Sequence, residues 1–160
     1  MALRTILTEG SPELRKVCRP VTNFDDRLAQ LLDDMLETMY ANEGAGLAGP
    51  QVGILRRVFV MDCGEGPVKV VNPEILDMQG EQHNYEGCLS VPEKWGKTTR
   101  PQTVRLRYQD ERGEVCEITA EGFTAMCICH ENDHLDGKLY IDIVEGDLLN
   151  KEDLKEEEEA

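Results

Sequence analysis

The chain lacks several features that mark membrane, exported and nucleic-acid-binding proteins. No apolar run approaches the ~20 residues that a membrane-spanning helix needs, and the first ten residues contain no apolar core of a secretion signal. Lysine and arginine number 17 against 32 aspartates and glutamates, and the net charge of −15 disfavours binding to phosphate backbones or anionic membrane surfaces. We therefore expect a cytoplasmic protein with no direct nucleic-acid or membrane contacts.

The six cysteines include no CxxC pair, which argues against a thioredoxin-like redox centre or a zinc ribbon. In the cytosol thiols stay reduced, and we interpret most of these cysteines as small buried apolar residues. With 160 residues, the chain is long enough for one domain with a hydrophobic core. We expect a single domain over residues 1–150 and an acidic tail over residues 151–160, either frayed or a solvated helix.

Apolar periodicity predicts a helix near each end of the domain and strands between them. Leucines and methionines recur at i, i+3, i+4 and i+7 within residues 25–40, which indicates an amphipathic helix capped by Thr22 or Asn23. Helices flanking mostly antiparallel strands favour an α+β fold. Strand signals lie at residues 57–61, 68–71, 75–78, 103–108 and 114–119, the last two joined as a hairpin.

The segment around His130 carries two of the three histidines, His130 and His134, with Glu131 directly after the first. On a helix, positions i and i+4 lie one turn apart on the same face, so both imidazoles can share one metal ion. Glu131 then flanks the metal as a possible base. The alternative is a pair of buried histidines that serve only the core.

An HExxH pair provides two ligands, so a catalytic metal site requires a third from elsewhere in the chain. Cys88 follows Gly87 and lies between predicted strands. A thiolate with two imidazoles leaves a fourth position open to water, which is the catalytic arrangement. The competing third ligand is Glu145, and it would make the protein an HExxH metallopeptidase.

The glycine-rich segment after the first helix contains a GxGxxG pattern at Gly44, Gly46 and Gly49. A dinucleotide loop follows a strand and opens a helix, whereas this segment follows a helix and continues into Pro50. We therefore reject nucleotide binding. The segment is either a flexible turn or a backbone that lines a site, with Gln51 as a side-chain amide donor.

Residues 44–51, 86–90 and 130–137 resemble the three motifs of peptide deformylases, in the same order. The resemblance extends from about residue 14 to residue 144. It implies an α+β fold, with mostly antiparallel sheets packed around a central HExxH helix and an N-terminal helix. It also implies removal of the formyl group from the N-terminal formylmethionine of nascent chains, with release of formate.

The resemblance further implies that Cys88, His130 and His134 bind Fe²⁺, for which Zn²⁺, Ni²⁺ or Co²⁺ can substitute. The metal would activate the attacking water, and Glu131 would move its proton to the leaving amine. The Gln51 amide and the backbone N–H of Leu89 would bind the developing oxyanion. The candidate substrate-binding residues are Gly44, Ala45, Gly46, Glu86, Gly87, Phe123, Met126 and Cys127.

Some positions depart from the family pattern, and Asp133 has two alternative roles. Gly49 stands where alanine is usual, and Cys129 stands where glutamine is usual. Asp133 is either a partner that orients a metal-bound histidine, with Arg100 beside it, or a solvated carboxylate. Some members dock on the ribosome through a basic C-terminal helix, and the acidic tail here argues against that route. A non-catalytic metal-binding relative is a further alternative.

Overall fold

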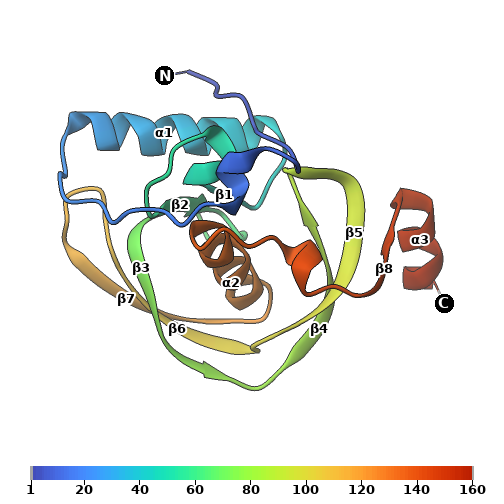
Figure 1. Cartoon of the computed structure of the whole chain (residues 1–160). Coiled ribbons are helices and arrows are strands. Elements are labelled where there is room, and N and C mark those ends of the chain that lie inside the picture. Colours follow the sequence, from blue (N-terminus) through green and yellow to red (C-terminus); the bar gives the residue numbers. More distant parts are fainter. Residues whose placement is uncertain (1, 160) are drawn as a thin grey trace.

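The computed structural model describes residues 2–159 as two antiparallel sheets and three α-helices (Figure 1). The α-helices are α1 (Asp26–Ala41), α2 (Phe123–Leu135) and α3 (Lys151–Glu159), and the 3₁₀ helices are η1 (Pro12–Arg15), η2 (Gly49–Val52) and η3 (Tyr140–Asp142). The strands are β1 (Gly46–Ala48), β2 (Val58–Met61), β3 (Val68–Gln79), β4 (Gln82–Cys88), β5 (Val91–Arg100), β6 (Thr103–Gln109), β7 (Val115–Glu121) and β8 (Glu145–Leu149). The predicted α+β class is confirmed.

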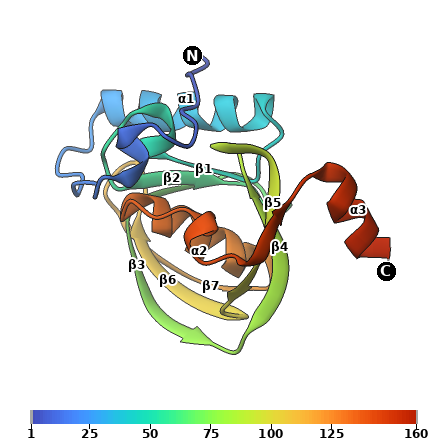
Figure 2. The same ribbon diagram turned by 45° about the vertical axis from the view of Figure 1, so that its right-hand side comes forward.

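The five-stranded sheet has the order β1-β2-β3-β6-β7, and the three-stranded sheet has the order β4-β5-β8. All of these neighbouring strands pair antiparallel. The two sheets curve around α2, and α1 lies on the opposite side of β1 and β2 (Figure 1, Figure 2). The predicted central helix is therefore enclosed between sheets.

Strand β2 shows how the sheet separates two cores. Val58 and Val60 belong to the cluster that contains the buried face of α1. Phe59 and Met61 belong to the cluster that contains the buried residues of α2. Successive side chains of a strand point to opposite faces, so an uninterrupted apolar run serves both clusters. Burial stabilises each such side chain by about 1.5–3 kcal/mol, which holds α2 against the sheet.

Helix α2 begins after Gly122, whose φ is +60°. Nine of its thirteen residues are buried, so it shows almost no amphipathic stripe. Phe123 at its first position is the main apolar exception, with 53% of its surface exposed. Within the part of the chain described, none of the helices is long and apolar enough to cross a membrane.

Several boundaries differ from the predictions. Residues 68–71 and 75–78 form one strand, β3, which continues through Asn72 at φ +50° with shifts in its register. The Asn72 side chain bonds both the N–H and the C=O of Val21, and this contact stabilises the irregular backbone. Asp25 caps α1 by accepting a hydrogen bond from Leu28 N at 3.0 Å, so neither Thr22 nor Asn23 has that role.

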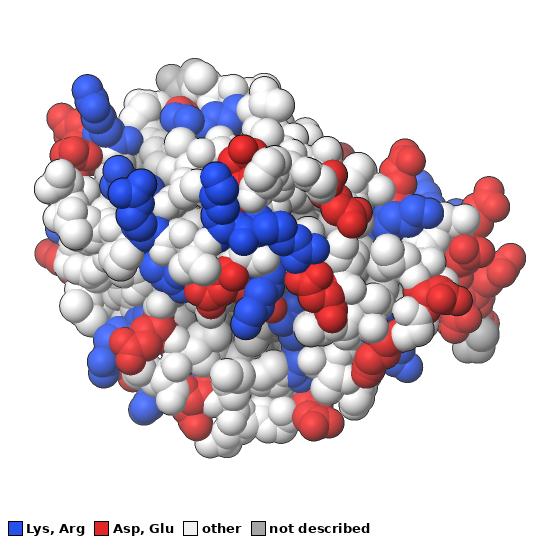
Figure 3. Space-filling view, in the orientation of Figure 1, with Lys and Arg blue, Asp and Glu red and all other residues white. Residues whose placement is uncertain are grey.

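Strands β4, β5 and β8 were not predicted from the sequence. Their apolar alternation is weak, because polar side chains occupy most positions of β4 and β5, and β8 is only five residues long. The acidic tail forms the exposed helix α3 beyond β8 (Figure 2). Acidic side chains gather over that helix on the surface (Figure 3).

Candidate metal centre and active site

Three potential ligands converge where the end of β4 meets α2. Cys88 is the last residue of β4, and His130 and His134 lie one turn apart on α2. One ligand atom from each residue lies within 4.8 Å of the others, and Cys88 Sγ is 3.5 Å from His134 Nε2. A sulfur and two imidazole nitrogens at this spacing match a divalent metal site with an open position.

Glu86 orients the first histidine of the pair. Its Oε1 is 2.7 Å from His130 Nδ1, and because a carboxylate accepts, Nδ1 carries the hydrogen. The lone pair of His130 Nε2 therefore remains for a metal. Burial acts to raise the pKa of Glu86, but hydrogen bonds from His130 and Arg100 outweigh it and lower the pKa to about 2.

Arg100 holds Glu86 in place from the next strand. Its Nε and Nη2 donate to the two Glu86 oxygens at 2.7 and 3.0 Å, and Thr98 donates to the same carboxylate. Arg100 Nη1 also donates to Asp133 Oδ2 at 2.7 Å. The predicted pairing of Asp133 with Arg100 is present. The carboxylate bonded to His130 is that of Glu86, however, and Asp133 contacts Arg100.

Burial and charge give the two histidines different properties. Burial lowers the pKa of His134 well below its usual range, which keeps the ring neutral and able to donate a lone pair. Burial also acts to lower the pKa of His130, but the Glu131 carboxylate, then Cys88 and Glu86, raise it well above its usual range. The surroundings thus favour a positive charge at this position, and a bound metal cation would provide it.

Glu131 is buried beside the metal ligands. Its Oε2 is 3.9 Å from His130 Nε2, and its Oε1 has no hydrogen-bond partner within residues 2–159. Burial raises the pKa of Glu131 to about 7. Gly46 of β1 lies so close that an added Cβ would be 2.5 Å from Glu131 Oε2. The glycine-rich segment is therefore a close-approach backbone that lines the site.

Gln51 on η2 contacts one of the potential metal ligands. Its Nε2 donates to Ser90 Oγ at 3.0 Å and lies 3.5 Å from Cys88 Sγ. Its Oε1 accepts from Ala48 N at 2.9 Å, which holds the amide in one orientation. Leu89 follows Cys88 in the turn between β4 and β5, and both Gln51 and Leu89 line the pocket.

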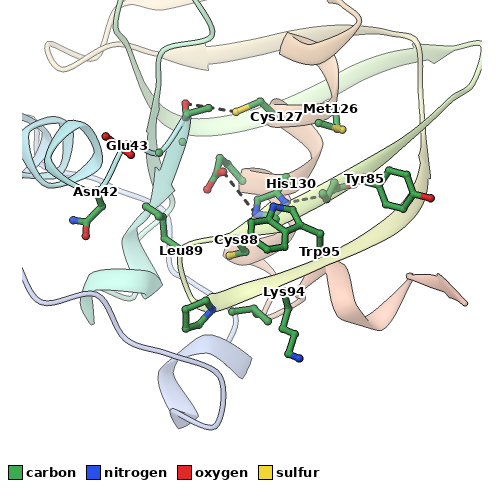
Figure 4. Close-up of a pocket in the computed structure, with 18 of the residues that line it drawn as sticks. Asn42, Glu43, Tyr85, Cys88, Leu89, Lys94, Trp95, Met126, Cys127 and His130 are labelled. Atoms are coloured by element: carbon green, nitrogen blue, oxygen red, sulfur yellow. Dashed lines mark hydrogen bonds and ion pairs between the residues drawn. The ribbon is translucent and has the colours of Figure 1, made fainter. Parts of the chain in front are cut away.

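A cavity of about 590 Å³ opens in front of these residues (Figure 4). All eight predicted substrate-binding residues contribute to its lining, although the Glu86 carboxylate itself is bonded to His130 and Arg100. Trp95, which was not predicted from the sequence, also lines the cavity. An added Cβ at Gly87 would lie 2.6 Å from Trp95 Nε1, so the absence of a side chain at Gly87 makes room for the indole. Its residue type could have identified it from the sequence, because Trp95 is the one tryptophan of the chain.

The remaining candidates lie outside the ligand group. Glu145 on β8 is exposed and accepts a hydrogen bond from Thr99 at 3.0 Å, so it does not replace Cys88. Burial raises the pKa of Cys129 to about 11, which keeps it a protonated thiol. At Gly49 an added Cβ would lie 2.6 Å from Ile54 O, so this backbone leaves no room for alanine without a shift.

The sequence matches the polypeptide deformylase family over residues 3–148. It is 57% identical over 148 residues to a peptide deformylase of Agathobacter rectalis, covering 92% of this chain and 94% of that protein. It is 50% identical over 155 residues to the peptide deformylase of Caldanaerobacter subterraneus subsp. tengcongensis, covering 97% of each chain.

Solved structures agree with the sequence matches. The fold is similar to a peptide deformylase from Thermotoga maritima, with a TM-score of 0.89, 46% identity and coverage of 90% of this chain and 99% of that chain. It is also similar to a peptide deformylase from Synechococcus elongatus in complex with actinonin, with a TM-score of 0.85, 39% identity and coverage of 94% and 81%. The match spans nearly the whole length, and the chain belongs to the polypeptide deformylase family.

Proposed function

We propose that this chain removes the formyl group from the N-terminal formylmethionine of newly made polypeptides and releases formate. The observation that carries the proposal is the convergence of Cys88, His130 and His134 beside Glu131, in one cavity. A metallopeptidase would need a third ligand downstream of the helix, and Glu145 is bonded to Thr99 instead.

Cys88, His130 and His134 would hold one divalent metal ion, which we propose is Fe²⁺, with Zn²⁺, Ni²⁺ or Co²⁺ as substitutes. A metal ion bound there would lower the pKa of a water molecule and polarise the formyl oxygen. Glu86 supports this assignment, because it fixes the His130 ring with its free nitrogen directed away from the Glu86 carboxylate.

Glu131 would act as the proton carrier of the reaction. A carboxylate whose pKa is about 7 can accept a proton from water and later release it to the leaving amine. The free Oε1 of Glu131, which has no hydrogen-bond partner among the described residues, is the acceptor for that proton. Gly46 keeps the carboxylate in position from one side, because its backbone lies directly against it.

Gln51 and Leu89 would bind the oxygen that becomes negatively charged as the formyl carbon turns tetrahedral. Ala48 N donates to Oε1 of the Gln51 amide, and this bond fixes the direction of the amide N–H groups before substrate binds. Losing one such donor typically raises the barrier by about 2.7–4 kcal/mol. The methionine side chain would contact Phe123, Met126 and Cys127 at the α2 side of the cavity (Figure 4).

The test is formate release from formyl-Met-Ala-Ser after anaerobic loading with Fe²⁺. We expect turnover of this peptide and none of its N-acetyl counterpart, because the formyl carbon carries only hydrogen. Glu131→Gln serves as the matched control, since it keeps the side chain's shape and removes the base. We expect a loss of at least about 100-fold in kcat with full metal content. Cleavage of an internal peptide bond instead of formate release would overturn the proposal.

A further inference from the structure

The side-chain amide of Gln51 uses both of its hydrogen-bond donors within the site. A primary amide carries two N–H groups on one nitrogen, and this nitrogen does not accept. Gln51 Nε2 donates to Ser90 Oγ at 3.0 Å and to Cys88 Sγ at 3.5 Å. One N–H is therefore directed at a hydroxyl, and the other at the sulfur of a potential metal ligand.

Ser90 is firmly held behind Gln51. It is fully buried, and only 1% of the Gln51 surface is exposed. The N-terminal segment connects the two residues through its backbone, because Leu7 N donates to Gln51 O and Glu9 N donates to Ser90 O, each at 2.7 Å. Ala48 N holds the other end of the amide at Oε1. Ser90 is not part of the cavity lining, so its hydroxyl acts on Gln51 and not on a substrate.

A hydrogen bond to a coordinating sulfur has a chemical consequence for the metal. A coordinating thiol is deprotonated, so Cys88 Sγ would carry a negative charge that an N–H stabilises. A stabilised thiolate donates less electron density, and hydrogen bonds to coordinating sulfurs change the properties of a metal centre in this way. The metal then polarises its remaining ligands more strongly. Gln51 thus adjusts the metal centre without being a ligand.

We infer that Ser90 is a positioning residue, whose hydroxyl fixes the Gln51 amide so that its second N–H bonds the Cys88 thiolate. This second N–H is also the one that would turn to the developing oxyanion, because Ser90 Oγ retains the first. Sulfur accepts hydrogen bonds more weakly than oxygen, so the bond to sulfur gives way to the oxyanion. The turn to the oxyanion rests on the proposed function, whereas the bond to sulfur requires only a bound metal.

The experiment uses Co²⁺-loaded protein, because a thiolate bound to Co²⁺ gives a charge-transfer absorption whose energy follows the electron donation of the sulfur. Ser90→Ala removes the acceptor of the first N–H, Ser90→Thr keeps a hydroxyl there, and Gln51→Leu removes both donors. Thr38→Val is the matched control. Thr38 also has a buried hydroxyl, but it lies on α1, where it donates to Asp34 O and accepts from Arg4 N.

We expect the absorption to move to longer wavelength in Ser90→Ala, because the thiolate loses part of its hydrogen bond, and at least as far in Gln51→Leu. The kcat for the formylated peptide should fall about tenfold in Ser90→Ala with little change in KM, which is less than the about 100–1,000-fold that follows removal of an oxyanion donor. Ser90→Thr and Thr38→Val should keep the wild-type spectrum and rate. In the Gln51→Leu background, Ser90→Ala should change neither.

An unchanged spectrum in Ser90→Ala, or an equal change with and without the Gln51 side chain, overturns the inference. A second measurement needs no variant, in case Ser90→Ala does not fold. Wild-type protein loaded with ¹¹³Cd should show a scalar coupling between a Gln51 side-chain amide hydrogen and the cadmium nucleus across the N–H···S contact, and its absence overturns the bond to sulfur. A wild-type protein that shows the coupling but releases no formate overturns the proposed function and supports the bond to sulfur.

Discussion

Gly46→Ala tests whether the position of Glu131 controls catalysis. Gly46 is the first residue of β1, and a Cβ added there would lie 2.5 Å from Glu131 Oε2, 2.8 Å from its Cδ and 2.9 Å from its Cγ. Real Cβ atoms do not approach heavy atoms this closely, so the carboxylate must move. The metal ligands are untouched by the substitution.

The size of the effect follows from these distances. To reach ordinary van der Waals contact the carboxylate must retreat by about 1 Å, and a displacement of that size at a reacting group costs about 100-fold in rate. The free energy of unfolding should fall by about 1–3 kcal/mol, as for other overpacked sites. Because Glu131 is not a ligand, the bound metal should remain stoichiometric.

A double-mutant cycle with Glu131→Ala isolates the contact. In that background the obstructing side chain is gone, so Gly46→Ala should be neutral or stabilising by about 0.5 kcal/mol, the usual gain from replacing a strand glycine. The measurements are kcat for formate release, metal content and urea unfolding of all four proteins. Unchanged kcat in Gly46→Ala, or an equal stability loss in both backgrounds, would refute the reasoning.

Three further predictions concern the ligands and the core. Cys88→Ala should lose the metal under dialysis that leaves the wild type loaded, and retention of one metal per chain would remove Cys88 from the ligand set. Glu86→Gln should weaken metal affinity by about 10–100-fold, because the neutral amide holds the His130 ring less well. Competition with a chelator measures the metal affinity, and an unchanged affinity would contradict the role of Glu86 in orienting His130. Leu32→Ala, in the fully buried face of α1, should lower the free energy of unfolding by about 2–5 kcal/mol and leave kcat of the folded protein intact. Chemical unfolding and the formate assay together check this prediction. A smaller loss of stability would mean that the core around position 32 collapses to fill the space.

Much of the site was predictable because its chemistry depends on residue type and short spacing. His130 and His134 at i and i+4 share a helix face whatever the rest of the chain does. Cys88 was identifiable by its type and by its place in a motif, and the structure brings it to both imidazoles. The periodic leucines and methionines of α1 identified that helix, and its structural bounds differ by one residue at each end.

Only the tertiary structure decided the contacts between distant segments. It selected Glu86, and not the neighbouring Asp133, as the partner of His130, because the pairing of β4 with β5 places Arg100 between the two carboxylates. It also placed Gly46 against Glu131 and Trp95 against Gly87. Side-chain type and spacing along the chain determine which groups can bind a metal or carry a proton. Which of those groups meet depends on strand register and sheet packing, and these arise from interactions between residues far apart in the sequence.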